Sequence, residues 1–257
     1  MVQQNAIARD ERPLSPFELA KQRLIVALDT PTAESALTLA GQLEDQCQWF
    51  KVGLELYIAA GPAIVEKLVN RGHSVFLDLK LHDIPNTVAA AVRAAGSLGA
   101  SMLTVHAAGG PAMLAAAREA ASVLASPPQL LAVTVLTSMD AAQLAAIGVQ
   151  EAPHMQVELL AQLGMDAGIR GFVCSPQEVS ALRVMTGAEG VLVTPGIRPA
   201  GADKGDQQRI ATPTSALEQG ASYLVVGRPI TQAADPALAA EAILMEIAEA
   251  LAIAPTE

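Results

Sequence analysis

Short β-branched apolar runs alternate with alanine- and leucine-rich stretches along almost the whole chain. Eight of these runs are predicted as strands: Leu24–Asp29, Phe50–Leu56, Ser74–Leu81, Ser101–His106, Leu130–Thr137, Gly171–Ser175, Gly190–Thr194 and Tyr223–Gly227. The stretches between them that show helical spacing include Ser35–Leu43, Ala63–Asn70, Thr87–Leu98, Ala112–Leu124, Val157–Leu163 and Gln177–Met185. Eight strand–helix units within 257 residues predict a single-domain TIM (β/α)8 barrel.

An open, doubly wound sheet would show the same alternation, and the placement of polar residues favours the barrel instead. Polar residues stand at or just beyond the carboxyl end of each predicted strand: Asp29, Lys51, Asp78, Lys80, His106, Thr137, Ser175, Thr194, Gly227 and Arg228. In a barrel those ends converge on one face, where the active site is expected, whereas an open sheet would spread them apart. Within the first strand, Asp29 is in phase with Ile25 and Ala27, which predicts that these residues face the barrel interior.

The third predicted strand carries charged residues at alternate positions within an apolar run. Side chains alternate between the two faces of a strand, so Asp78, Lys80 and His82 are expected on one face and the intervening leucines on the other. Ionised groups on a buried face are costly unless they are paired, and such a cluster is typical of catalytic chemistry. Asp29 and Lys51 from the neighbouring strands are expected at the same rim, where the two carboxylates and two ammonium groups can pair alternately.

Two loops near the end of the chain have the features of a phosphate site. They are Val193–Pro199 and Val225–Pro229, which follow the seventh and eighth predicted strands. In TIM barrels these two loops commonly bind phosphate through backbone N–H groups and a short helix. Each loop contains a glycine and an arginine, Arg198 and Arg228, which supply close backbone approach and forked donors. The polar, glycine-containing segment Pro199–Arg209 is predicted to be a lid over the ligand.

Composition and charge exclude several other classes of protein. The net charge of −10 argues against a broad nucleic-acid surface and against an anionic membrane patch, and no apolar run is long enough for a membrane helix. The cysteines, Cys47 and Cys174, lack metal-type spacing and are predicted as core residues in a reducing cytoplasm. Residues 1–14 are predicted to be a flexible leader before a barrel domain that spans residues 15–257, which begins with a capping box at Ser15–Glu18.

These motifs resemble, in order and approximate spacing, the bacterial type of the orotidine 5′-phosphate decarboxylase family. The resemblance covers nearly the whole chain after the leader and is highly specific. The segments that carry it are Ala27–Asp29, Lys51–Gly53, Phe76–Thr87, Val105–Ala107, Val133–Ser138, Val173–Ser175, Thr194–Pro199 with Gln207, and Gly227–Thr231.

The resemblance implies a homodimeric barrel that converts orotidine 5′-monophosphate to uridine 5′-monophosphate and carbon dioxide without a metal or organic cofactor. It implies that Lys80 protonates C6 and that Asp78 faces the substrate carboxylate. Asp83 would reach into the partner's site and complete a network with Lys51, Asp78 and Lys80. The implied substrate contacts are Asp29 and Lys51 to ribose, Thr87 from the partner subunit, Thr137, Ser138 to the base, and Arg198, Gln207, Gly227 and Arg228 to phosphate.

Other functions remain open on the residues alone. Magnesium-dependent decarboxylases and aldolases of sugar phosphates share the pattern Asp-x-Lys-x-x-Asp, and a metal-dependent epimerase is a more remote alternative. Both are disfavoured by the continuation Ile84–Thr87 and by Gln207. His82 and His106 could suggest a metal ligand set, but single rim histidines more often orient their neighbours. A non-catalytic barrel that binds a phosphorylated metabolite would need the phosphate loops but not Lys80.

Overall fold

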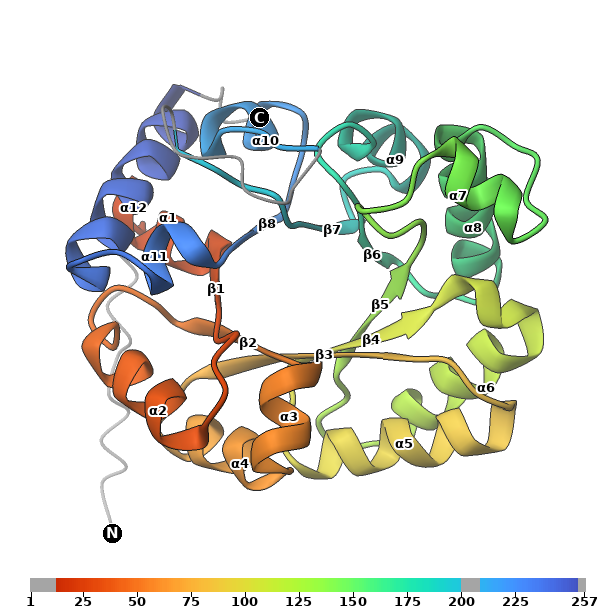
Figure 1. Cartoon of the computed structure of the whole chain (residues 1–257), viewed down its shortest axis with the longest axis horizontal. Coiled ribbons are helices and arrows are strands. Elements are labelled where there is room, and N and C mark those ends of the chain that lie inside the picture. Colours follow the sequence, from red (N-terminus) through yellow and green to blue (C-terminus); the bar gives the residue numbers. More distant parts are fainter. Residues whose placement is uncertain (1–12, 200–208, 254–257) are drawn as a thin grey trace, which may run out of the picture.

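The computed structural model describes residues 13–199 and 209–253, and these residues form one closed barrel. The strands follow one another around the barrel in sequence order, with the helices outside them (Figure 1). Their bounds are β1 Leu24–Ala27, β2 Trp49–Gly53, β3 Ser74–Leu81, β4 Met102–His106, β5 Gln129–Val133, β6 Gly171–Val173, β7 Val191–Thr194 and β8 Tyr223–Val226. All neighbouring pairs are parallel, and β1 pairs with β8 to close the ring, which confirms the predicted TIM barrel.

The helices include one at each of the six alanine- and leucine-rich stretches that the sequence predicts as helical, with ends shifted by a few residues. They are α1 Pro16–Arg23, α2 Ala33–Gln42, α3 Leu54–Ala60, α4 Ala63–Asn70, α5 Pro85–Ser97, α6 Gly110–Ser122, α7 Ala141–Ala146, α8 Pro153–Asp166, α9 Val179–Thr186, α10 Pro213–Glu218, α11 Arg228–Thr231 and α12 Pro236–Ile253. A short 3-10 turn, η1 Ala107–Gly109, precedes α6. None of the helices in the described ranges is both long enough and apolar enough to cross a membrane.

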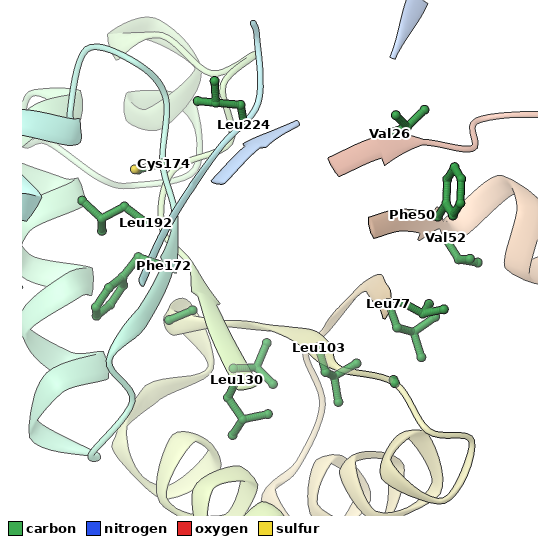
Figure 2. Packing of buried hydrophobic residues seen from close by; sticks show 14 of the residues in the cluster. Val26, Phe50, Val52, Leu77, Leu103, Leu130, Phe172, Cys174, Leu192 and Leu224 are labelled. Carbon is green, nitrogen blue, oxygen red and sulfur yellow. The ribbon is translucent and has the colours of Figure 1, made fainter. Parts of the chain in front are cut away.

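Two separate apolar clusters flank the strands. The inner cluster fills the barrel, and its buried members are Ile25, Ala27, Phe76, Met102, Leu131, Val193 and Val225. The outer cluster lies between the strands and the helices; Figure 2 shows side chains such as Phe172 and Leu103 pointing from their strands toward the surrounding helices. Ile25 and Ala27 lie in the inner cluster while Val26 lies in the outer one, so the phase predicted for the first strand is correct.

The second strand is shorter than predicted. It ends at Gly53, and the residues Leu54–Ala60 form α3, whereas the sequence indicated a strand that continued to Leu56. A short apolar run fits a strand or a buried helix equally well, which explains the error. The early strand end matters for the site because Gly53, the last residue of β2, lies beside the Lys51 ammonium.

The chain enters the barrel through α1, as the capping box predicted. The Ser15 hydroxyl accepts a hydrogen bond from the Glu18 backbone N–H, and the Glu18 carboxylate accepts one from the Ser15 N–H. This reciprocal pairing satisfies donors that the first turn of a helix leaves open. The helix then packs against α12. Most of the predicted leader, residues 1–12, lies outside the described residues.

Candidate active site

Two adjoining hollows open at the carboxyl ends of the strands. The first, which we call the apolar hollow, has a volume of about 170 Å³ and is lined by Lys51, Phe76, Asp78, Lys80, Val133, Val135, Leu136, Thr137, Val173, Pro195 and Val225. The second, the polar hollow, has a volume of about 240 Å³ and is lined by Ala27, Asp29, Lys51, Pro195, Gly196, Arg198, Val225, Gly227, Arg228, Thr231 and Gln232. They share Lys51, Pro195 and Val225, so one ligand can occupy both.

Asp78 and Lys80 form an ion pair on the wall of the apolar hollow. The Lys80 ammonium lies 2.8 Å from each carboxylate oxygen of Asp78, and their side chains are 30% and 14% exposed. Most of the other residues that line this hollow are apolar. Charges interact more strongly in such surroundings than in water, because the effective dielectric constant is lower. Because Asp78 and Lys80 both line this hollow, the prediction that they share the barrel rim is correct.

The strand that carries this pair is irregular, which the alternating pattern did not predict. Leu77 lies opposite Leu103 and Leu81 lies opposite Val105, so β3 has two more residues than β4 in this interval. Lys80 has φ = 51°, and among the described residues it is the only one other than glycine with positive φ. That backbone conformation costs a non-glycine residue roughly 1–2 kcal/mol and occurs mainly where function requires it.

The second predicted pair is Lys51 with Asp29. The Lys51 ammonium donates to the Asp29 carboxylate at 2.7 Å; the Lys51 side chain is 12% exposed and the Asp29 side chain 56%. A Cβ atom on Gly53 would lie 2.9 Å from this ammonium and 3.2 Å from this carboxylate. The absence of a side chain at Gly53 therefore leaves room for the pair. Within a single chain, Lys51 contacts Asp29 and not Asp78, so alternate pairing along the rim is only partly realised.

The polar hollow joins the loops after β7 and β8, as the sequence predicted. Gly196 has φ = 79°, a conformation that favours glycine, and the neighbouring Arg198 is buried. The Arg198 backbone N–H donates to the Ala211 carbonyl at 2.9 Å, which closes the base of the intervening segment. Gly227 precedes the short helix α11, which begins at the exposed Arg228. The two arginines therefore lie on opposite loops of one hollow.

The remaining predicted substrate contacts have different outcomes. Thr137 lies in the loop after β5, beyond the end of the strand at Val133, and lines the apolar hollow. Ser138 is exposed and is not among the residues that line either hollow. Gln207 and most of the predicted lid lie outside the described residues.

Asp83 and Thr87 do not join the hollows of their own chain. Both are exposed in the loop and first turn that follow β3, and the Asp83 carboxylate accepts a hydrogen bond from the Ile84 N–H at 2.6 Å. The apolar side chain of Ile84, between these two residues, is 67% exposed. These three residues therefore line neither hollow of their own chain.

A buried ion pair that the sequence did not reveal connects three loops of the mouth. Arg209 pairs with the carboxylate of Glu178 and donates to the carbonyls of Leu136 (3.0 Å) and Thr137 (3.4 Å). Glu178 also accepts hydrogen bonds from the backbone N–H and the hydroxyl of Ser175. Arg209 was predicted as part of a lid and Glu178 as part of an ordinary helix, and no short-range signal connects residues so far apart in sequence.

The two rim histidines contact each other. The rings of His82 and His106 have centroids 5.4 Å apart, and burial lowers the pKa of the His106 imidazole, with the nearby His82 and Lys80 adding to the effect. In the described ranges, no three histidine, cysteine or acidic side chains gather as the ligands of a metal ion would. Cys47 and Cys174 are buried, as predicted, and burial raises the pKa of each thiol to about 12.

A larger hollow, of about 520 Å³, lies at the opposite end of the barrel. It is lined by residues at the amino ends of β4, β5 and β6, such as Ser101, Gln129 and Arg170. The catalytic residues of TIM barrels stand at the carboxyl ends of the strands, and this hollow has no counterpart of the Asp78–Lys80 pair. Its size therefore does not make it the active site.

The closed parallel barrel and the paired charges at the carboxyl ends of its strands define the class: a TIM-barrel enzyme. The chain belongs to the Orotidine 5′-phosphate decarboxylase / HUMPS family, whose model matches residues 22–243. It is 55% identical over 230 residues to an orotidine 5′-phosphate decarboxylase of Nitrosococcus oceani, covering 89% of this chain and 99% of that protein. It is 53% identical over 234 residues to one from Moorella thermoacetica, covering 89% and 93%.

A solved structure has the same fold. The crystal structure of orotidine 5′-phosphate decarboxylase from Lactobacillus acidophilus superposes with a TM-score of 0.78 at 40% sequence identity, covering 88% of this chain and 99% of that one. Family membership and the resemblance found in the motifs therefore agree.

Proposed function

We propose that this chain decarboxylates orotidine 5′-monophosphate to uridine 5′-monophosphate, the last step of de novo pyrimidine nucleotide synthesis. The observation that carries the proposal is the adjacency of the two hollows, which share Lys51, Pro195 and Val225. A pyrimidine ring fits the apolar hollow beside Lys80, and a phosphate fits the polar hollow beside Arg198 and Arg228. Membership of the family supports the same reaction.

The chemistry of the reaction explains why a lysine is needed at this place. When the bond from C6 to the carboxylate breaks, its electron pair stays on C6 and carbon dioxide leaves. That pair lies in the plane of the ring, so the ring π-system cannot delocalise it. An ammonium group beside C6 offsets the developing charge and then gives its proton to C6. Lys80 is assigned this role.

Asp78 acts on the substrate before the bond breaks. It holds the Lys80 ammonium through both carboxylate oxygens. It is assigned a place opposite the substrate carboxylate. Two unit charges about 4 Å apart interact by about 4 kcal/mol at an effective dielectric constant near 20. Repulsion between the two carboxylates is relieved when carbon dioxide leaves, whereas the attraction of Lys80 grows as charge develops on C6.

The other end of the substrate supplies binding energy. Arg198, Arg228 and the backbone at Gly227 are assigned to the phosphate, and the Lys51–Asp29 pair to the ribose hydroxyls. Thr137 is assigned to the base side of the apolar hollow. Ser138, toward the base, and Gln207, toward the phosphate, remain predictions from the resemblance.

We further propose that the reaction needs no metal or organic cofactor. The rival enzyme class, magnesium-dependent decarboxylases and aldolases of sugar phosphates, is not favoured, because the relatives at 53–55% identity are orotidine 5′-phosphate decarboxylases. The two mechanisms differ in one measurement. Activity that persists in excess EDTA supports the cofactor-free mechanism, and activity that EDTA abolishes and magnesium restores refutes it.

The active sites are proposed to be shared between two subunits of a cytoplasmic homodimer. The exposure of Asp83, Ile84 and Thr87 supports this. A second chain packed on this segment would bury Ile84, and Asp83 and Thr87 would then lie near the active site of that second chain. Mixing Asp83→Ala dimers with Lys80→Ala dimers tests it. Random exchange should restore activity to about a quarter of the sites, since each mixed dimer holds one intact site. No recovery after demonstrated exchange contradicts shared sites.

The principal experiment follows the absorbance of orotidine 5′-monophosphate as the purified chain consumes it. Lys80→Ala should abolish turnover and retain binding of uridine 5′-monophosphate. The matched control is Lys67→Ala, which removes an exposed lysine from α4, outside both hollows. Turnover that survives in Lys80→Ala refutes the role of Lys80, and no turnover by the unsubstituted chain refutes the function itself.

A further inference from the structure

Thr104 is the residue of β4 that lies opposite the irregular part of β3. Its neighbours Leu103 and Val105 pair with Leu77 and Leu81, so Thr104 faces the interval in which β3 carries its two extra residues. The side chain of Thr104 is completely buried. Water therefore cannot replace whatever hydrogen bonds its hydroxyl makes.

The hydroxyl contacts both members of the catalytic pair. The Lys80 backbone N–H donates to Thr104 Oγ1 at 2.8 Å, and the same hydroxyl lies 3.1 Å from Asp78 Oδ1. An N–H group can only donate and an ionised carboxylate can only accept, so both directions are determined. The Thr104 hydroxyl accepts a hydrogen bond from the Lys80 N–H and donates its single proton to the Asp78 carboxylate.

The contact to the Lys80 N–H has a conformational consequence. At φ = 51° the Lys80 backbone is in a region that residues other than glycine seldom adopt, and the surrounding structure must hold it there. The Thr104 hydroxyl takes the place of the strand-to-strand partner that the bulge removes from this N–H. Relaxation of φ to the extended region would turn the Cα–Cβ bond of Lys80 and carry its ammonium away from Asp78.

We infer that Thr104 is a positioning residue for the reaction: its hydroxyl holds Lys80 in the left-handed conformation and orients the Asp78 carboxylate that receives the lysine ammonium. The inference rests on the role proposed for Lys80. Thr104 touches neither substrate nor the reacting carbon in this account. It acts only through Lys80 and Asp78, so its effect should fall on the chemical step and not on the binding of the nucleotide.

Thr104→Val is the direct test, because valine keeps the shape of the side chain and removes only the hydroxyl. Misplacing a catalytic group by a fraction of an ångström to 1 Å costs up to about 100-fold, so kcat should fall by about 10- to 100-fold while KM stays nearly unchanged. Thr104→Ser keeps the hydroxyl and removes the methyl group. It should lose thermal stability but retain kcat.

Thr134→Val is the matched control. Thr134 is also a buried threonine beside the strand ends, but within the described part of the chain its hydroxyl donates to the backbone carbonyl of Val173, at 3.4 Å, and not to a catalytic residue. This variant should lose stability without loss of kcat. Equal loss of kcat in Thr104→Val and Thr104→Ser, or unchanged kcat in Thr104→Val, overturns the inference.

A measurement on the unsubstituted chain applies even if Thr104→Val does not fold. Amide hydrogen exchange of Lys80 should be slow, because its N–H is bonded to a buried hydroxyl; exchange at the rate of an exposed loop overturns the inference. Lys80→Ala separates this outcome from the proposed function. Loss of turnover in Lys80→Ala with full turnover in Thr104→Val refutes only the role of Thr104, whereas turnover retained by Lys80→Ala refutes the role of the lysine itself.

Discussion

The apolar hollow and the polar hollow share a wall, but they use charge in opposite ways. The apolar hollow surrounds one ion pair, Asp78 with Lys80, mostly with hydrocarbon. The polar hollow offers glycine backbone, two arginines and the exposed carboxylate of Asp29. The interaction energy between two charges is larger where few surrounding dipoles screen them, and a phosphate binds best where many hydrogen-bond donors converge. The comparison indicates that one hollow serves the reaction and the other supplies binding energy.

The loops that surround the apolar hollow are connected through Arg209, and breaking this connection has the largest effect on stability that we expect. Arg209→Met leaves the buried Glu178 carboxylate without its partner, so the free energy of unfolding should fall by about 3–5 kcal/mol. Urea denaturation measures it. The double variant Arg209→Met/Glu178→Gln removes both charges and should recover part of the loss. A loss below about 1 kcal/mol in the single variant would show that the pair does not stabilise the mouth.

The apolar hollow is next tested at Asp78. Asp78→Asn keeps the shape of the side chain but removes the charge that holds Lys80, and kcat should fall by about 10²- to 10³-fold. Steady-state kinetics with orotidine 5′-monophosphate measures the change, and affinity for uridine 5′-monophosphate should change little. Asp45→Asn, at an exposed position, is the control. A rise in KM without a fall in kcat would show that Asp78 contributes to substrate binding and not to the chemical step.

Arg228 tests the polar hollow with less risk to the fold than the buried Arg198. Arg228→Ala removes a charged donor to the phosphate, and KM should rise by about 10- to 100-fold. The nucleoside orotidine, which lacks the phosphate, should be processed equally poorly by the variant and by the unsubstituted chain. Arg71→Ala, an exposed arginine before β3, is the control. If Arg228→Ala impairs the reaction of both substrates equally, Arg228 does not bind the phosphate.

The shared wall is tested at Gly53, with the smallest effect. The added Cβ of Gly53→Ala would crowd the Lys51 ammonium, which lies at the end of a flexible side chain and can shift by a few tenths of an ångström. We expect KM to rise by about threefold with little change in kcat. Gly41→Ala adds a methyl group where no atom lies within 4 Å and serves as the control. Unchanged KM in Gly53→Ala would mean that Lys51 tolerates displacement.

Much of the fold and part of the site could be predicted from local pattern. The bounds of β3 and α4 are those expected, and Asp78, Lys80, Lys51 and Asp29 do meet at one rim. Periodicity indicates which face a residue takes, and the parallel direction of all strands places their carboxyl ends at one end of the barrel. The second strand is shorter than its sequence predicts because apolar residues continue from Gly53 into α3.

The sequence by itself determined the eight units, the inward phase of their strands and the kinds of charge at the mouth. Only the tertiary structure decided how those charges are held. The left-handed Lys80, its contact with Thr104 and the pairing of Arg209 with Glu178 each depend on the register of a neighbouring strand or on a contact between distant loops. Local propensity carries no information about such contacts, because their energy arises only when separate elements pack together.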